Sequence, residues 1–162
     1  MQKNGGRGLY YADGLFETVR YDEACGGYLQ LDAHRKRLER GAGILGLRIA
    51  RDVFSSFIPD VPRAAVRWTF WRRGGPPYYS PETDVEWTVE ARPIVAEREP
   101  VRLRTASHCV CPSAFSRFKS LNALAYVLAA RETAPDTALM PSTKKTSGAI
   151  LAAAATGYNV FF

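Results

Sequence analysis

The chain has 162 residues, of which 46% are hydrophobic and 23% charged, and its formal net charge at pH 7 is +6. This composition is typical of a globular protein, and the length allows one complete domain, or one domain and part of another. The amino-terminal residues lack the apolar core of a signal peptide, and no apolar run reaches the about 20 residues of a membrane span. We therefore expect a cytoplasmic protein that does not act in a membrane.

The excess of positive charge is scattered along the sequence. No run of five or more Lys or Arg residues occurs, and the basic residues do not form a stripe. A nucleic-acid-binding module would rest on net charge and a few aromatic residues alone, so we do not expect nucleic acid as a partner. A small anionic ligand explains the excess charge equally well.

The three cysteines, Cys25, Cys109 and Cys111, form no CxxC pair. A closed metal site needs about four donors, and no second pair of ligands lies near Cys109 and Cys111 in the sequence. We expect reduced thiols and no metal.

The first half of the chain has the pattern of a hairpin. A strand is expected over residues 15–21, a glycine-containing loop over residues 22–27 and a return strand over residues 28–31. The alternation of the first strand places its side chains on two faces: Phe16, Thr18 and Arg20, and Leu15, Glu17 and Val19.

Asp32 is expected to cap a helix over residues 33–45, which carries the basic cluster Arg35-Lys36-Arg37. Such a cluster usually lies on a solvated face, but one member turned inward would make a fixed anion site. Strands interleaved with two helices indicate an α+β fold with a two-layer domain over residues 1–111. The other expected elements are a short helix over residues 53–58 and strands over residues 64–71, 85–94 and 101–106.

Residues 112–118 are expected to be a linker, after which Lys119 stands at the mouth of a helix. Ser120 is the expected N-cap, and Pro135 ends the helix. An amine held beside apolar surface has a lowered pKa, as a Schiff-base lysine requires. The alternative is a surface lysine that only flanks a core helix. The helix has one apolar face, formed by Leu121, Leu124, Ala125 and Leu128.

Four segments of the chain, RGLYYADGLFETVR at residues 7–20, HRKRL at 34–38, KSLN at 119–122 and NVFF at 159–162, occur in this order. Together they resemble the class IV aminotransferase family, the pyridoxal-phosphate enzymes of fold type IV. That family includes branched-chain and D-amino acid aminotransferases and aminodeoxychorismate lyase. The resemblance implies that residues 119–162 begin a larger, barrel-like α/β domain, which is incomplete here.

The resemblance also implies roles for particular residues. Lys119 would form the Schiff base with pyridoxal 5'-phosphate and move the substrate proton, and Arg37 would hold the cofactor phosphate, which suits a guanidinium fork. Asn159 would also contact the cofactor, whereas His34 beside the arginine is expected to be structural. Three residues would lie near the substrate pocket: Tyr11, Phe16 and Arg20.

The chain departs from the family pattern at two positions. The family has a glutamate five residues before the asparagine that aligns with Asn159, where it keeps the cofactor ring protonated as an electron sink. Here that position is Ala154. Ala123 stands where many members carry a tyrosine.

The resemblance predicts an aminotransferase that acts on an amino acid, uses pyridoxal phosphate and forms a homodimer. Two alternatives remain open. One is elimination from an aminated chorismate derivative, as in aminodeoxychorismate lyase. The other is a catalytically impaired remnant of the family, which the alanine at position 154 motivates.

Overall fold

The computed structural model describes residues 7–74, 83–94, 102–109, 117–124, 127–128, 131 and 137–142. The chain divides into two compact units. The first contains residues 1–95 and 115–122, and the second contains residues 96–114 and 123–162. Lys119 belongs to the first unit. The domain limits expected from the sequence, 1–111, 112–118 and 119–162, stay a prediction.

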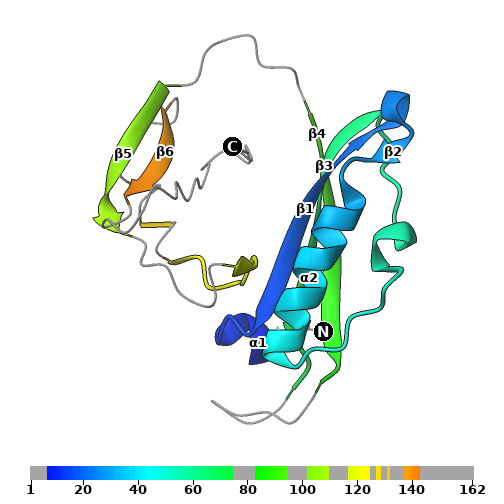
Figure 1. The fold of residues 1–162 in the computed structure, drawn as a ribbon, viewed down its shortest axis with the longest axis horizontal. Coiled ribbons are helices and arrows are strands. Elements are labelled where there is room, and N and C mark those ends of the chain that lie inside the picture. Colours follow the sequence, from blue (N-terminus) through cyan, green and yellow to red (C-terminus); the bar gives the residue numbers. More distant parts are fainter. Residues whose placement is uncertain are drawn as a thin grey trace, which may run out of the picture. The chain divides into compact units, whose positions relative to one another are not determined.

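The first unit is built on an antiparallel sheet with the strand order β2-β1-β3-β4 (Figure 1). This sheet confirms the three long strands expected from alternation. The return strand is shorter than expected because the chain enters a helix at Leu31. The short 3-10 helix η1, Glu23–Cys25, makes the turn between the first two strands. The strand bounds are β1, Gly14–Asp22; β2, Gly27–Tyr28; β3, Arg63–Arg72; and β4, Val85–Pro93.

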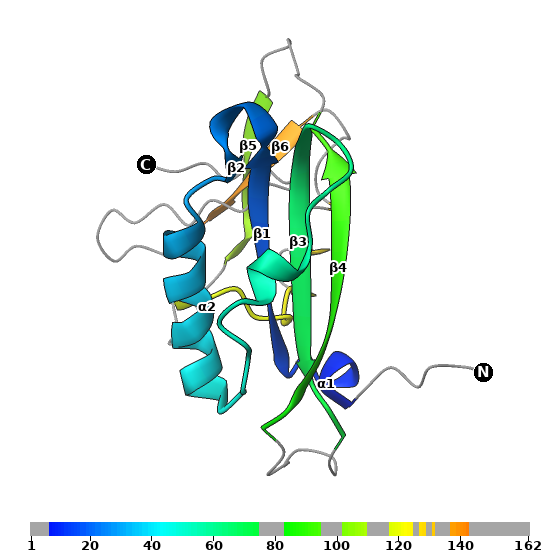
Figure 2. The ribbon, with the colours of Figure 1, turned by 90° about the vertical axis from the view of Figure 1, so that its right-hand side faces the viewer.

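The helix α2, Leu31–Leu45, covers one face of this sheet (Figure 2). It begins before the expected cap, because Gln30 is the N-cap residue and Asp32 lies in the first turn. The expected second helix is a single 3-10 turn, η2, Val53–Ser56. The core fills the space between these helices and the sheet, and its largest fully buried side chains include Leu15, Val19, Phe54, Val66, Trp68 and Phe70.

A short helix that the sequence analysis did not predict, α1, Arg7–Tyr10, precedes the sheet. The Asp13 carboxylate after it accepts a hydrogen bond of 2.8 Å from Nε of Arg72, at the end of β3. The Arg72 guanidinium also donates to the carbonyl oxygen of Leu45, at the end of α2. Asp13 and Arg72 therefore join the start of β1 to the ends of β3 and α2.

The second unit contains a parallel pair of strands, β5, Arg102–Cys109, and β6, Thr137–Ser142. The strand expected over residues 101–106 is present, but it pairs with β6 and not with the four-stranded sheet. Within the described part of the chain, no helix is long and apolar enough to cross a membrane.

The helix expected immediately after Lys119 begins later. Ser120 forms an antiparallel bridge with Leu15, so its role as N-cap was wrong. The first described helical residue is Leu124, and Arg131 donates to the carbonyl oxygen of Val127, as in an α-helix. Leu124, on the expected apolar face of this helix, is 64% exposed. The prediction failed because residues 119–121 pair with β1 before the helix starts.

Candidate active site

Lys119 is held against the edge of β1 by backbone hydrogen bonds. The amide of Phe16 donates to the carbonyl oxygen of Lys119 at 2.9 Å, and the amide of Leu121 donates to that of Gly14 at 3.0 Å. This edge of β1 is available because β2 pairs only with Tyr21 and Asp22, at the other end of the strand. A lysine about 100 residues from β1 in sequence thus lies beside its first residues.

The residue before the lysine anchors the same segment from the other side. Phe118 is buried in the core between α2 and β1. A Cβ atom at Gly41 of α2 would lie 3.0 Å from side-chain atoms of both Phe118 and Leu15. The glycine therefore allows the helix, the strand and Phe118 to approach closely, and Lys119 has little freedom of backbone position.

The amine of Lys119 lies over an aromatic ring. Its Nζ is 5.4 Å from the ring centroid of Phe16, and the guanidinium carbon of Arg67 is 4.2 Å from the same centroid. Burial lowers the pKa of Lys119 below its ordinary value. The Glu17 carboxylate raises this pKa, while the cations Arg37 and Arg67 lower it, and the net shift is downward. More of the amine is therefore neutral, and nucleophilic, near neutral pH than for an exposed lysine.

Beside this amine, Glu17 and two residues of α2 form a buried cluster of charged and polar groups. Arg37 donates to Glu17 through two hydrogen bonds of 2.6 Å, from Nε to Oε1 and from Nη2 to Oε2. The Nδ1 atom of His34 lies 2.8 Å from Oε2 of Glu17. Burial by itself would raise the pKa of Glu17, but the hydrogen bonds from Arg37 and His34 and the positive charges nearby lower it below 4.5.

The ionised carboxylate fixes the tautomer of His34. A carboxylate only accepts hydrogen bonds, so Nδ1 carries the hydrogen and donates it to Glu17. The distance of 3.1 Å between Nη2 of Arg37 and Nδ1 of His34 is then a contact between two donors. The interpretation of His34 as structural agrees with this geometry, because the ring supports the carboxylate that binds Arg37.

Three of the residues expected from the sequence lie close to one another: Lys119, Phe16 and Arg37. Arg20 is on the same sheet face as Phe16 but four residues further along, about 13 Å at the rise of a strand. Its guanidinium pairs with Asp22 at 3.2 Å. The structure does not bring it to the lysine, and its role in the substrate pocket stays a prediction.

The two other expected site residues lie elsewhere or outside the description. Tyr11 is about half exposed and follows α1, and its role near the substrate also stays a prediction. Asn159 and Ala154 lie outside the described residues.

Sequence reasoning assigned no role to Glu17 or Arg67, although a signal existed for the first. Glu17 occupies an apolar position of the alternating strand, between Leu15 and Val19, and a carboxylate expected on a buried face needs a partner. Arg67 carried no such signal, because it falls at a solvent-facing position of its strand. Its approach to Phe16 depends on the register of β1 and β3, which the sequence does not show.

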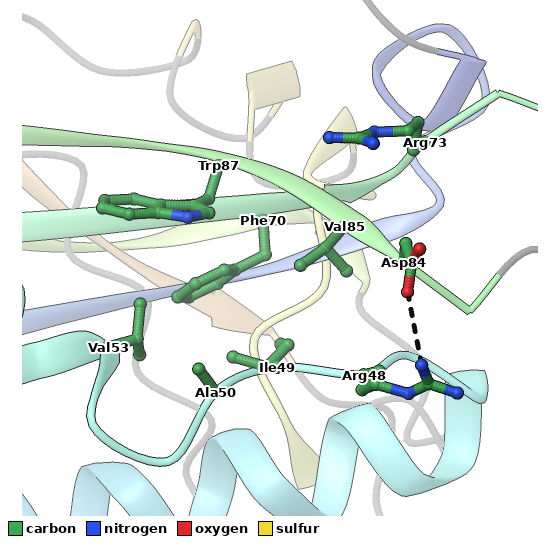
Figure 3. Close-up of a pocket in the computed structure, with 9 residues that line it drawn as sticks. All are labelled: Arg48, Ile49, Ala50, Val53, Phe70, Arg73, Asp84, Val85 and Trp87. Carbon is green, nitrogen blue, oxygen red and sulfur yellow. Dashed lines mark ion pairs between the residues drawn. The ribbon is translucent and has the colours of Figure 1, made fainter.

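A hollow lies beside β3 and β4, on the face of the sheet that α2 covers (Figure 3). It has a volume of about 240 Å³, and the side chains of Phe70, Val53 and Val85 point into it. The guanidinium of Arg48 at its mouth is 3.7 Å from the carboxylate of Asp84. The residues that line this hollow include none of the cluster around Lys119, so the hollow is separate from the lysine site.

The cluster around the lysine combines three chemical capacities. A neutral amine can attack a carbonyl and form an imine, a guanidinium can bind a phosphate or carboxylate, and an aromatic ring can cover a flat ligand. In the described part of the chain, Nη1 of Arg37 has no hydrogen-bond partner, and the side chain is 28% exposed. An amine suited to an aldehyde and a guanidinium suited to an anionic group are therefore present in the same cluster.

Comparison with solved structures shows the same fold in enzymes of related kinds. A protein provisionally named 4-amino-4-deoxychorismate lyase matches with a TM-score of 0.63 and 27% identity, over 83% of this chain and 55% of the neighbour. The 4-amino-4-deoxychorismate lyase from Pseudomonas aeruginosa matches with a TM-score of 0.68 and 22% identity, over 88% of this chain and 57% of the neighbour.

An aminotransferase shares the fold as well. The branched-chain aminotransferase from the thermophilic archaeon Thermoproteus uzoniensis matches with a TM-score of 0.68 and 19% identity, over 85% of this chain and 53% of the neighbour. The chain thus spans a little over half the length of these three neighbours. No curated protein matches the sequence significantly.

The sequence profile of the family described as "Amino-transferase class IV" matches residues 14–150, which is well over half of the chain and includes Arg37 and Lys119. The match begins at the first residue of β1 and covers both segments that form the cluster around the lysine. The sequence profile and the shared fold agree, and this chain belongs to the class IV aminotransferase family.

Proposed function

We propose that the protein is a pyridoxal-phosphate-dependent aminotransferase that acts on an amino acid through Lys119. The observation that carries this proposal is the position of the Lys119 amine, which lies over Phe16 with a lowered pKa and within electrostatic reach of Arg37. We also propose that it works in the cytoplasm as a homodimer, as the family resemblance implies.

The described residues fit pyridoxal phosphate at two of its groups. Arg37 keeps donors for a phosphate, and its own pKa is raised by the hydrogen bonds to Glu17, so it remains a cation. The neutral amine of Lys119 suits the aldehyde. When bound, the cofactor would supply an electron sink for the bond that breaks at the substrate Cα atom.

The residues of this chain would contribute binding, orientation and proton transfer. Arg37 would bind the phosphate group, and Phe16 would limit how far the amine of Lys119 can move. After a substrate amine has displaced it, Lys119 would hold or release a proton at Nζ. The lowered pKa of this amine favours such exchange near neutral pH.

The experiment is a spectral titration of the full-length protein with pyridoxal phosphate, followed by turnover with D- and L-amino donors and a keto-acid acceptor. We expect a visible absorbance band that Lys119→Ala abolishes, and formation of the new amino acid. A protein without a spectral response contradicts the proposal. A spectral response without turnover of any donor supports the impaired family member.

Elimination by a lyase is a second candidate function. The observation that favours it is the 27% identity with a neighbour provisionally named 4-amino-4-deoxychorismate lyase, compared with 19% for the archaeal aminotransferase. Incubation with 4-amino-4-deoxychorismate distinguishes the two reactions. Release of a keto acid without an added acceptor indicates the lyase, whereas dependence on a keto-acid acceptor indicates the aminotransferase.

A further inference from the structure

Glu17 is a carboxylate in a position that packing alone would give to an apolar residue. It is 1% exposed, lies opposite the fully buried Trp68 on β3, and points to the same side of β1 as Leu15 and Val19. A buried ion pair is often no more stable than a well-packed apolar pair of similar volume. Stability of the core therefore does not explain why a carboxylate stands there.

The contacts of Glu17 give it a single orientation. Both of its oxygens are occupied, one by Nε of Arg37 and the other by Nη2 of Arg37 together with Nδ1 of His34. His34 and Arg37 lie three residues apart on α2, so both reach the carboxylate from the same helix face. The imidazole fixes the carboxylate, and the carboxylate fixes the guanidinium.

This arrangement leaves one defined side of the guanidinium for a ligand. The two bonds to Glu17 use Nε and Nη2, and an arginine is planar, so the direction in which Nη1 can donate is set before any ligand binds. A donor that is already ordered loses less conformational entropy on binding than a mobile side chain. The 28% of the Arg37 side chain that stays exposed gives a ligand access.

We propose that Glu17 is a positioning residue that orients the guanidinium of Arg37 and so determines how tightly this site binds a phosphate group. This inference rests on the proposed function, because the phosphate in question is that of pyridoxal phosphate. Glu17 acts through Arg37 and does not itself contact the ligand.

The alternative is a buried ion pair that only supports the fold. The two roles differ in their ligand dependence. A structural defect weakens every ligand of the site, whereas loss of the orientation of Arg37 weakens only ligands that carry the phosphate. Pyridoxal, which has the same aldehyde and ring but no phosphate, is therefore the matched probe.

The test measures the dissociation constants of pyridoxal phosphate and of pyridoxal for the full-length protein, from the absorbance that depends on Lys119. A hydrogen bond to a charged group contributes enough free energy that we expect Glu17→Gln to weaken the binding of pyridoxal phosphate about tenfold or more. The binding of pyridoxal should weaken less than about threefold. The control Glu23→Gln, an exposed residue one residue after β1, should change neither constant. Equal weakening of both ligands in Glu17→Gln overturns the proposal.

A double variant keeps the test decisive if Glu17→Gln does not fold. Glu17→Leu combined with Arg37→Met replaces the ion pair by apolar side chains. Folded proteins often tolerate such a replacement of a buried ion pair. If Glu17 acts through Arg37, the double variant should bind the two ligands with the same ratio as Arg37→Met alone. A further loss of pyridoxal phosphate binding in the double variant, beyond that of Arg37→Met, contradicts the proposal.

The two ways of failing are separate. A wild-type protein that responds to neither ligand contradicts the proposed function, and with it the role of Glu17. If the wild-type protein binds pyridoxal phosphate through Lys119, but Glu17→Gln leaves the ratio of the two dissociation constants unchanged, only the role of Glu17 is contradicted.

Discussion

Lys119 and Glu17 come from distant parts of the chain, and the charge state of each depends on the other. The Glu17 carboxylate favours the ammonium form of Lys119, while burial and the two arginines Arg37 and Arg67 favour the neutral amine. The balance leaves the amine with a lowered pKa. The alternation of β1 places Glu17 on the same face as Leu15 and Val19, but only the fold shows that this face is buried and that the lysine interacts with the carboxylate.

Removing the cation of Arg67 should raise the pKa of Lys119 toward 10.5, since a neighbouring positive charge disfavours the ammonium. We expect Arg67→Gln to move the pH profile of reductive methylation at Lys119 to higher pH, measured by mass spectrometry of the peptide. Arg63→Gln, an exposed residue on the same strand, is the control and should leave the profile unchanged. An identical profile for wild type and Arg67→Gln is the result that contradicts this account.

Glu17 should make the stability of the fold depend on acid. Because its pKa is lowered in the fold from 4.5, the carboxylate stabilises the protein above the unfolded value and loses this contribution as the pH falls through the lower, folded value. We expect the urea midpoint of wild type to fall more steeply than that of Glu17→Gln between about pH 5 and pH 3. The same steepness in both proteins would exclude this linkage, and Glu23→Gln should behave as wild type.

At the scale of elements, the site depends on the edge of β1 where residues 119–121 pair. Gly14 begins this strand, and a Cβ atom there would lie 2.1 Å from the carbonyl oxygen of Phe70 and 2.7 Å from Cδ1 of Leu121. The Asp-Gly pair at positions 13 and 14 is therefore structural, with the aspartate bound to Arg72 and the glycine required by close packing. The sequence segment that contains this pair, residues 7–20, was recognisable from the family resemblance. The close packing that requires a glycine at position 14 was not.

Gly14→Ala should destabilise the protein by about 2–3 kcal/mol, because the backbone oxygen of Phe70 cannot move away from the new methyl group without strain. The matched control is Gly43→Ala on α2, where a Cβ atom meets nothing within 4 Å and helix propensity predicts a gain of about 0.5–1 kcal/mol. Urea unfolding measures both changes. A neutral Gly14→Ala would show that Gly14 does not approach Phe70 and Leu121 as closely as described.

For the whole molecule, local sequence patterns predicted the positions of strands and helices better than they predicted which of these segments pair with each other. Alternation indicated β1, β3 and β4, and the basic helix was found within two residues of its start, because these periods depend on one buried face. The pairing of β5 with β6 and the bridge between Leu15 and Ser120 depend on contacts across long separations, which a single sequence does not show. The family resemblance predicted the roles of Lys119 and Arg37. The carboxylate of Glu17, which interacts with both, was recognised only in the fold.

The role of Lys119 is tested most sharply by finding where pyridoxal phosphate attaches. The chain has five lysines, Lys3, Lys36, Lys119, Lys144 and Lys145, so reduction with borohydride and peptide mapping gives a clear answer. We expect that the reduced adduct lies on Lys119, survives in Lys36→Ala, and is lost in Lys119→Ala. An adduct spread over several lysines, or one that persists after Lys119→Ala, would contradict this role of Lys119.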